Sequence, residues 1–140
     1  MAETFTTRRR VEFADTDMAG IAHFSAFFRY MEAAEHALFR SLGLSIYDRR
    51  QGRHLSFPRV SAACDYQSPA RCEEELDFCV TIAKLGRTSI GYRFRITRDG
   101  APVAEGRMTS VCCHVEPDKP LRPTAIPEDI AALLRPFVEP

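Results

Sequence analysis

One change of hydrophobic period constrains the fold of this chain more than any other feature. Apolar residues recur at helical spacing over residues 25–42, and Gly43 supplies a natural stop for that helix. Further along, apolar and polar residues alternate over 76–83 and again over 90–97, which is the period of half-buried strands. Because one long helix must pack against the sheet that these strands form, the pattern predicts an α+β layer.

The expected order of elements is strand, long helix, sheet and short helix. Residues 6–13 resemble a first strand, and the small and acidic residues of 14–20 predict a loop before the long helix. Residues 57–115 then predict an antiparallel meander of at least four strands. Turn residues separate its central strands, at Gly86-Arg87 and Asp99-Gly100. Three prolines are expected to end the sheet: Pro117, Pro120 and Pro123. Residues 127–137 predict a short amphipathic helix.

Length and composition set the class of protein. A chain of 140 residues suits one domain, so residues 1–140 are predicted to form a single unit. Its 19 basic and 19 acidic residues balance, so no overall field would draw it to nucleic acid or to an anionic membrane. The polar N-terminus lacks the apolar run of a signal peptide, and five cysteines without C-x-x-C spacing suggest neither disulfides nor zinc. We therefore expect a cytoplasmic protein with reduced thiols.

Two carboxylates, Asp15 and Asp17, stand in the loop before the long helix, close to Gly20. A helix N-terminus carries unpaired N–H groups and positive potential, which can stabilise an oxyanion that develops on a thioester carbonyl. A nearby carboxylate could attack that carbonyl or direct a water molecule to it. Aspartates are also common in turns and helix caps, where their role is structural. From these residues alone, both interpretations stay open.

Residues 11–21, V-E-F-A-D-T-D-M-A-G-I, closely resemble the signature of the 4-hydroxybenzoyl-CoA thioesterase family, a strand that ends in D-x-D-x-x-G and leads into the central helix. Residues 65–71 are similar to the family's second strand and the turn after it, and residues 83–89 to its next hairpin. The resemblance covers roughly residues 9–114. It implies the hot dog fold, an antiparallel sheet wrapped around one long central helix, and an acyl-CoA thioesterase that needs no cofactor besides the coenzyme A of its substrate.

The resemblance also implies roles for residues around the loop. The family's catalytic carboxylate falls on Asp17, with Asp15 in support and Gly20 completing the motif. The family's thioester carbonyl meets a backbone N–H that matches Phe24, so the main chain of this residue is carried over, and not its ring. Many relatives have Tyr, His or Asn where this chain has residues 23–25, H-F-S, so we expect different side-chain contacts to the acyl group.

Coenzyme A carries several phosphate charges, which need local cations or hydrogen-bond donors on the protein. Basic and hydroxyl residues gather at strand ends and turns, namely Arg71, Lys84, Arg87, Thr88 and Ser89. The matching hairpin of the family contributes to the nucleotide end of the ligand, which implies the same role here. Alternatively, each of these residues taken singly is a solvated polar or charged side chain of a hairpin, without a role in binding.

Other residues offer weaker chemistry. His23 could polarise the thioester or steer water, because imidazole exchanges protons near neutral pH, although packing at the helix entry would explain it as well. Residues 32–36, E-A-A-E-H, lack the second histidine of zinc helix motifs, so Glu32 and His36 are expected to pair on the helix surface and no metal site is predicted. Cys64 has no evident His and acidic partners, and we expect it to pack in a strand.

The sequence thus predicts an enzyme that hydrolyses an acyl-CoA thioester to a free acid and coenzyme A, with Asp17 as nucleophile or general base. A non-catalytic module that binds acyl-CoA or an acyl-carrier protein is one alternative, since a fold does not fix an activity. A hot dog hydratase, which needs its own acid and base, is another. Exposed sheet edges and the resemblance both favour a homodimer or homotetramer, with no nucleic acid or membrane as partner.

Overall fold

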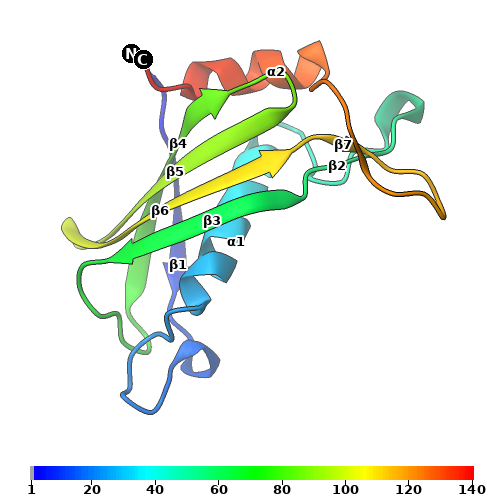
Figure 1. Cartoon of the computed structure of the whole chain (residues 1–140). Coiled ribbons are helices and arrows are strands. Elements are labelled where there is room, and N and C mark those ends of the chain that lie inside the picture. The colour runs from blue at the N-terminus through cyan, green and yellow to red at the C-terminus, as the bar shows by residue number, and fades with distance from the viewer. Residues whose placement is uncertain (1) are drawn as a thin grey trace.

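The computed structural model of the protein describes residues 2–140 (Figure 1). Its helices are α1 (Ala26–Ser41) and α2 (Glu128–Leu134), with 3-10 turns at Phe13–Asp15, Arg50–Gly52 and Arg135–Phe137. Its strands are β1 (Phe5–Arg10), β2 (Leu55–Ser56), β3 (Arg59–Tyr66), β4 (Glu75–Leu85), β5 (Ser89–Arg98), β6 (Ala101–Val111), β7 (Cys113–His114) and β8 (Arg122–Pro123). Within residues 2–140, every helix is too short or too polar to cross a membrane.

Five strands form one antiparallel sheet in the order β1-β4-β5-β6-β3, and α1 lies against one face of it (Figure 1). The alternating sequence explains this arrangement, because alternate side chains of a strand point to the same face. Phe78 and Val80 of β4 and Phe94 and Ile96 of β5 are almost completely buried in the core beneath the helix. The predicted α+β layer with its antiparallel sheet is confirmed, but the meander comprises only β4, β5 and β6, because β3 pairs with β6 at the far edge and β4 pairs with β1.

Helix α1 buries the stripe that its sequence predicts. Phe27, Met31, Ala34 and Leu38 follow the helical period, and all four lie in the core. Gly106 of β6 lies under this helix, where any Cβ atom would collide with the sulfur of Met31. A glycine at this point of the strand therefore lets the helix approach the sheet closely.

The first strand ends earlier than predicted. The pattern of residues 6–13 indicates one strand, but β1 stops at Arg10 and Phe13–Asp15 forms a 3-10 turn. The Asp15 carboxylate causes this turn, because it accepts the Glu12 N–H at 3.0 Å while the Glu12 side chain caps the Asp15 backbone. As a result Phe13 is 81 % exposed and does not continue the strand.

The sequence predicts that the three prolines lie outside strands, but one of them does not. β2, β7 and β8 form a second sheet of three short strands, and Pro123 of β8 pairs with Cys113 of β7. Proline is tolerated there because a strand at a sheet edge does not need every N–H for pairing. The main sheet itself ends at Val111, before the prolines, as expected.

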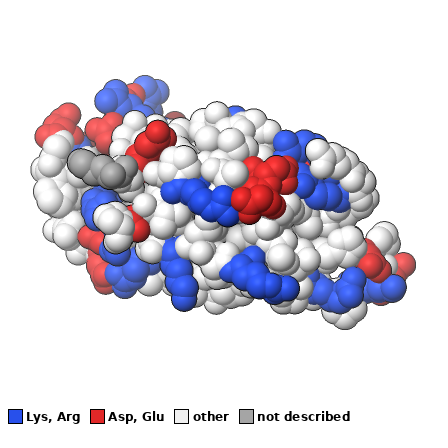
Figure 2. Space-filling view, turned by 90° about the horizontal axis from the view of Figure 1, so that it is seen from above, with Lys and Arg blue, Asp and Glu red and all other residues white. Residues whose placement is uncertain are grey.

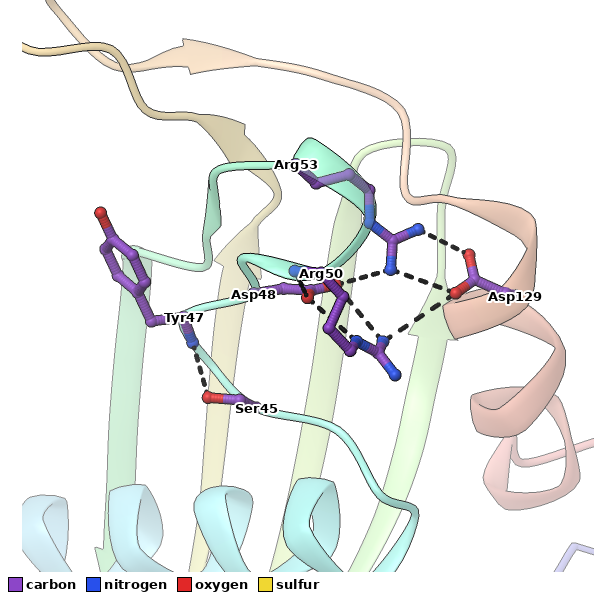
Figure 3. A network of polar contacts seen from close by, with 6 residues as sticks. All are labelled: Ser45, Tyr47, Asp48, Arg50, Arg53 and Asp129. Atoms are coloured by element: carbon purple, nitrogen blue, oxygen red, sulfur yellow. Dashed lines mark hydrogen bonds and ion pairs between the residues drawn. The ribbon is translucent and has the colours of Figure 1, made fainter.

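Ion pairs fasten the segment between α1 and β2 to α2 (Figure 3). Arg53 contacts Asp48 at 2.7 Å and Asp129 at 2.9 Å, and Arg50 contacts Asp48 at 3.1 Å. Burial alone would raise the pKa of Asp48, but hydrogen bonds from Arg50 and the charge of Arg53 hold it below its ordinary value. This carboxylate is therefore ionised at neutral pH and holds the segment in place.

Charges of both signs are interleaved on the face seen from the α2 end (Figure 2). This distribution agrees with the net charge of zero. Along the lower margin of this view, Lys and Arg side chains are more frequent, and uncharged residues separate them.

Strand β3 leaves one edge of the main sheet uncovered. It pairs with β6 on one side, and its residues 60–63 are exposed. Their side chains are mostly small, and Val60 is 64 % exposed at a β-bulge between Arg59 and Ser61. An open edge of this length is a ready template for pairing with another strand.

Candidate active site

A cleft of about 510 Å³ opens between the start of α1 and the loop that follows β3. Its walls are mainly apolar and include Ile21, Phe24, Phe27 and Tyr66. Asp17 supplies the one carboxylate among the lining residues. An apolar cleft with few polar groups is the usual form of a small-molecule site.

Asp17 is held at the mouth of this cleft by a tight turn. Its N–H donates to the Ile21 carbonyl at 2.9 Å, and its own carbonyl accepts the Gly20 N–H at 2.9 Å. The carboxylate oxygen Oδ1 accepts the Ala19 N–H at 2.8 Å, while Oδ2 has no hydrogen-bond partner among residues 2–140. Gly20 has φ +78°, a backbone conformation that glycine adopts without strain. The turn thus fixes the carboxylate and leaves one of its oxygens available.

Asp15 has a different environment from Asp17. It is 8 % exposed and accepts hydrogen bonds from Tyr30 Oη at 2.8 Å and from Arg29 at 3.1 Å. Burial tends to raise its pKa, but the Glu12 N–H, Tyr30 and Arg29 together hold the pKa of Asp15 below its ordinary value. Asp15 is accordingly a buried, ionised anchor that joins the loop to α1, and it does not line the cleft.

Phe24 lines the cleft just before α1 begins. Its N–H donates no hydrogen bond to any of the residues 2–140, although the neighbouring N–H groups of His23 and Ser25 are both paired. An unpaired N–H at a helix start is a donor for a ligand oxygen. Asp17, with its available carboxylate oxygen, and Phe24, with its unpaired N–H, both line the cleft.

His23 does not line the cleft. Its Nδ1 lies 2.8 Å from Ser25 Oγ, and its ring packs beside that of Phe24 with centroids 4.5 Å apart. The side chain is exposed, next to the site and outside its walls.

The family model of the thioesterase-like superfamily matches residues 11–134. The chain belongs to the thioesterase-like superfamily. A solved structure of a hypothetical protein from Thermus thermophilus is 32 % identical, with 94 % of this chain and 98 % of that chain covered and a TM-score of 0.83. A 1,4-dihydroxy-2-naphthoyl-CoA hydrolase of Synechococcus elongatus is 28 % identical, over 75 % of this chain and 78 % of the relative. A structure of 4-hydroxybenzoyl CoA thioesterase, at 23 % identity, covers 95 % of this chain and 99 % of its own with a TM-score of 0.85, which shows the fold alone.

These similarities confirm the predicted family and the hot dog fold, and they confirm a thioesterase as the class of enzyme. The cleft of this thioesterase lies where the signature D-x-D-x-x-G meets α1, as the resemblance implied. Asp17, Gly20 and Phe24 are thus brought together. Arg71 is close by, because it forms a β-bridge with Ile21.

The predicted phosphate-binding hairpin of this thioesterase lies elsewhere. β4 begins at Glu75, near the Asp17 loop, and ends at Leu85, within the predicted hairpin of residues 84–89 (Figure 1). Since an antiparallel strand rises about 3.4 Å per residue, the two ends of β4 are roughly 30 Å apart. Lys84, Arg87, Thr88 and Ser89 therefore stand at the opposite end of the sheet from the cleft of the same chain.

Some lining residues were missed as site residues. Tyr66, Gln67 and Pro69 belong to the segment 65–71, whose similarity to the family signature could have indicated them. Of the helix aromatics, Phe27 lines the cleft whereas Phe28 packs against the core.

The alternative reactive groups are placed as follows. Cys64 lies half-buried in β3, where burial raises the pKa of its thiol and so disfavours the nucleophilic thiolate.

Within residues 2–140, His, Cys, Asp and Glu side chains form no group suited to a metal ion. Glu32 contacts Arg59 of β3 at 3.5 Å, whereas the acidic contact of His36 among residues 2–140 is Glu35 at 4.0 Å, so the predicted surface pair of Glu32 with His36 does not form.

Proposed function

We propose that this thioesterase hydrolyses an acyl-CoA thioester, with Asp17 as its catalytic carboxylate and the Phe24 N–H as donor to the thioester oxygen. The observation that carries the proposal is the cleft, in which an available carboxylate oxygen and an unpaired N–H share apolar walls. The name of the Synechococcus relative, a hydrolase of a CoA thioester, supports the choice of coenzyme A as the thiol.

The proposed chemistry follows from these two groups. The thioester oxygen accepts the Phe24 N–H, and the start of α1 adds positive potential where the oxyanion develops. Asp17 Oδ2 then either attacks the acyl carbon to give a mixed anhydride or takes a proton from a water molecule that attacks it. In both routes the carbon–sulfur bond breaks, water supplies the new acid oxygen, and the sulfur leaves as the coenzyme A thiol. Arg71, which is bridged to the cleft residue Ile21, is proposed as a further contact to the substrate.

The apolar walls indicate an apolar acyl group, either aromatic or aliphatic. The test is a panel of benzoyl-, short-chain and long-chain acyl-CoA thioesters, assayed by release of free thiol. We expect thiol release from at least one of them at a catalytic rate. Binding without release would instead identify a non-catalytic module, and loss of enoyl absorbance without thiol release would identify a hydratase.

The proposal includes a cytoplasmic location. All five cysteines are free, and Cys112 and Cys113 are buried. Several unpaired thiols are typical of proteins in reducing compartments.

The proposal also includes a homodimer as the functional unit, alone or joined into a homotetramer. Two copies can pair their β3 edges in antiparallel fashion across a two-fold axis. Such pairing reverses the strand direction, so the end of the partner's sheet that carries residues 84–89 comes beside the Asp17 end of this chain. Each cleft would then receive Lys84, Arg87, Thr88 and Ser89 from the partner. The separation of hairpin and cleft within one chain supports this arrangement.

We expect the protein to be at least a dimer at micromolar concentration, as measured by light scattering. Ala63→Lys should shift it toward monomer and reduce thioester hydrolysis, because residues at the middle of β3 meet their own copies and like charges there repel. Ala101→Lys, at an exposed position of β6, is the matched control and should change neither property. A monodisperse wild-type monomer with full activity would contradict the dimer.

Arg87→Ala should raise KM about tenfold while kcat changes little, since a phosphate contact far from the carbonyl acts equally in ground and transition states. Steady-state kinetics with the best acyl-CoA of the panel measures both constants. Arg95→Ala, another exposed arginine, is the control and should leave KM unchanged. A collapsed kcat with constant KM would assign Arg87 a different role.

A further inference from the structure

The chain is held from two directions just before it enters α1. Ala22 donates its N–H to the Ala70 carbonyl at 2.7 Å, and His23 donates its N–H to the Asp15 carbonyl at 2.7 Å. A third contact comes from the sheet, where Tyr66 Oη donates to the Phe24 carbonyl at 2.7 Å. The backbone just before Phe24 and the peptide group that follows it are therefore fixed by different neighbours.

Tyr66 acts from a rigid position. It is the last residue of β3 and pairs with Ala104 of β6, so its backbone belongs to the main sheet. Its ring meets Phe27 edge to face, with centroids 5.3 Å apart and the planes at 77°. Tyr66 thus connects the sheet to the helix entry across the apolar cleft that both of them line.

The carbonyl that Tyr66 binds is one that a longer helix would use. In a regular α-helix, the Phe24 carbonyl would accept the Phe28 N–H four residues later. Here the Phe28 N–H donates to the Ser25 carbonyl at 3.2 Å, and α1 begins only at Ala26. The Tyr66 hydroxyl thus holds the carbonyl that the Phe28 N–H would use in a longer helix. Without the hydroxyl, α1 can extend backward and turn the Phe24 backbone with it.

We propose that Tyr66 is a positioning residue, whose hydroxyl keeps Phe24 out of the helix so that its N–H faces the thioester oxygen. This inference rests on the proposed function, and it concerns a side chain that the catalytic motif does not contain. Burial raises the pKa of Tyr66 to about 12, so the hydroxyl keeps its proton and remains a donor over the neutral range.

Tyr66→Phe removes the hydroxyl and keeps the ring that packs on Phe27. We expect kcat to fall about tenfold to a hundredfold, the scale of a misplaced group or a weakened oxyanion donor, with KM changed less than about twofold. Tyr47→Phe is the matched control, because Tyr47 is also a partly exposed tyrosine with a hydrogen-bonded hydroxyl, and its kcat should stay unchanged. An unchanged kcat for Tyr66→Phe, or a loss expressed only in KM, would overturn the inference.

A second measurement does not depend on turnover. In NMR spectra of the unliganded protein, Tyr66→Phe should shift the backbone amide signals of Phe24 and Phe28. Hydrogen exchange at the Phe28 amide should also slow, because an α-helical hydrogen bond to the Phe24 carbonyl replaces its 3.2 Å contact to the Ser25 carbonyl. Unchanged signals at both amides would overturn the positioning role. If the wild-type protein released no thiol from any acyl-CoA, the proposed function would fail while these spectra still tested the hydrogen bond.

Discussion

Asp17→Asn is expected to lower kcat by a factor of about 100 to 10,000, because the amide can neither attack the thioester nor accept a proton from water. The fold should survive. Asparagine can keep the turn, since its side-chain oxygen can accept the Ala19 N–H as Asp17 Oδ1 does. Substrate should still bind, so equilibrium titration of the inactive variant with an acyl-CoA can measure the binding affinity.

Two other aspartates separate a chemical loss from damage to the loop. Asp99→Asn changes an exposed residue of the β5–β6 turn and should leave both kcat and thermal stability unchanged. Asp15→Asn removes a buried charge that Tyr30 and Arg29 bind, so it should lower the melting temperature and reduce activity less than Asp17→Asn does. If Asp17→Asn stayed folded with near-native turnover, Asp17 would not be the catalytic carboxylate.

The parts of the fold that the sequence predicted are those set by local pattern. The helical stripe around Met31 and the alternation around Val80 each reflect one buried face, and a few neighbouring residues suffice to specify it. The end of β1 was predicted wrongly because a tertiary anchor decides it. Asp15 is bound by Tyr30, which lies 15 residues away along the chain, and local periodicity carries no sign of that contact.

The candidate site divides in the same way. That Asp17 and Phe24 lie in one cleft could be predicted because one continuous segment, from the loop to the start of α1, carries both. The similarity of residues 65–71 could have indicated Tyr66 as a cleft residue, but not its hydrogen bond to the Phe24 carbonyl, because that contact depends on the packing of β3 against the helix entry, 42 residues distant in sequence. The hairpin of Arg87 was predicted as a binding element, but its distance from the cleft depends on the direction and length of β4.

Glu35 shows most clearly what sequence alone leaves out. In the sequence it belongs to a polar helix motif, yet in the structure it is completely buried between α1 and the sheet, where it binds Arg59 of β3. Among residues 2–140, the hydroxyl of Tyr92 lies close to it without a hydrogen bond of normal geometry, and Ser110 Oγ is likewise buried without a hydrogen-bond partner. A buried glutamate is not visible in the period of a helix, because its burial depends on an arginine 24 residues away.

This carboxylate should make stability depend on pH. Burial raises the pKa of Glu35 to about 7, against the opposing charge of Arg59, from an ordinary value of 4.5. In that interval the folded protein holds a proton that the unfolded chain has released, so the free energy of unfolding falls as pH rises from about 4.5 to about 7. The loss is on the order of 3 kcal/mol for a shift of this size. His36, whose pKa burial and Arg59 lower, contributes a slope of the opposite sign.

Glu35→Gln should therefore remove the falling limb of the stability profile, because an amide does not titrate. Urea denaturation of both proteins between pH 4.5 and 8, at one protein concentration, measures the difference, and the contribution of His36 is present in both curves and largely cancels. Turnover should change little, since Glu35 lies nine residues beyond the start of α1, about 13 Å along its axis from the cleft. Two parallel stability profiles would mean that Glu35 stays ionised over the whole pH range as the partner of Arg59. The pair would then connect α1 to the edge strand β3 as a plain ion pair that takes up no proton.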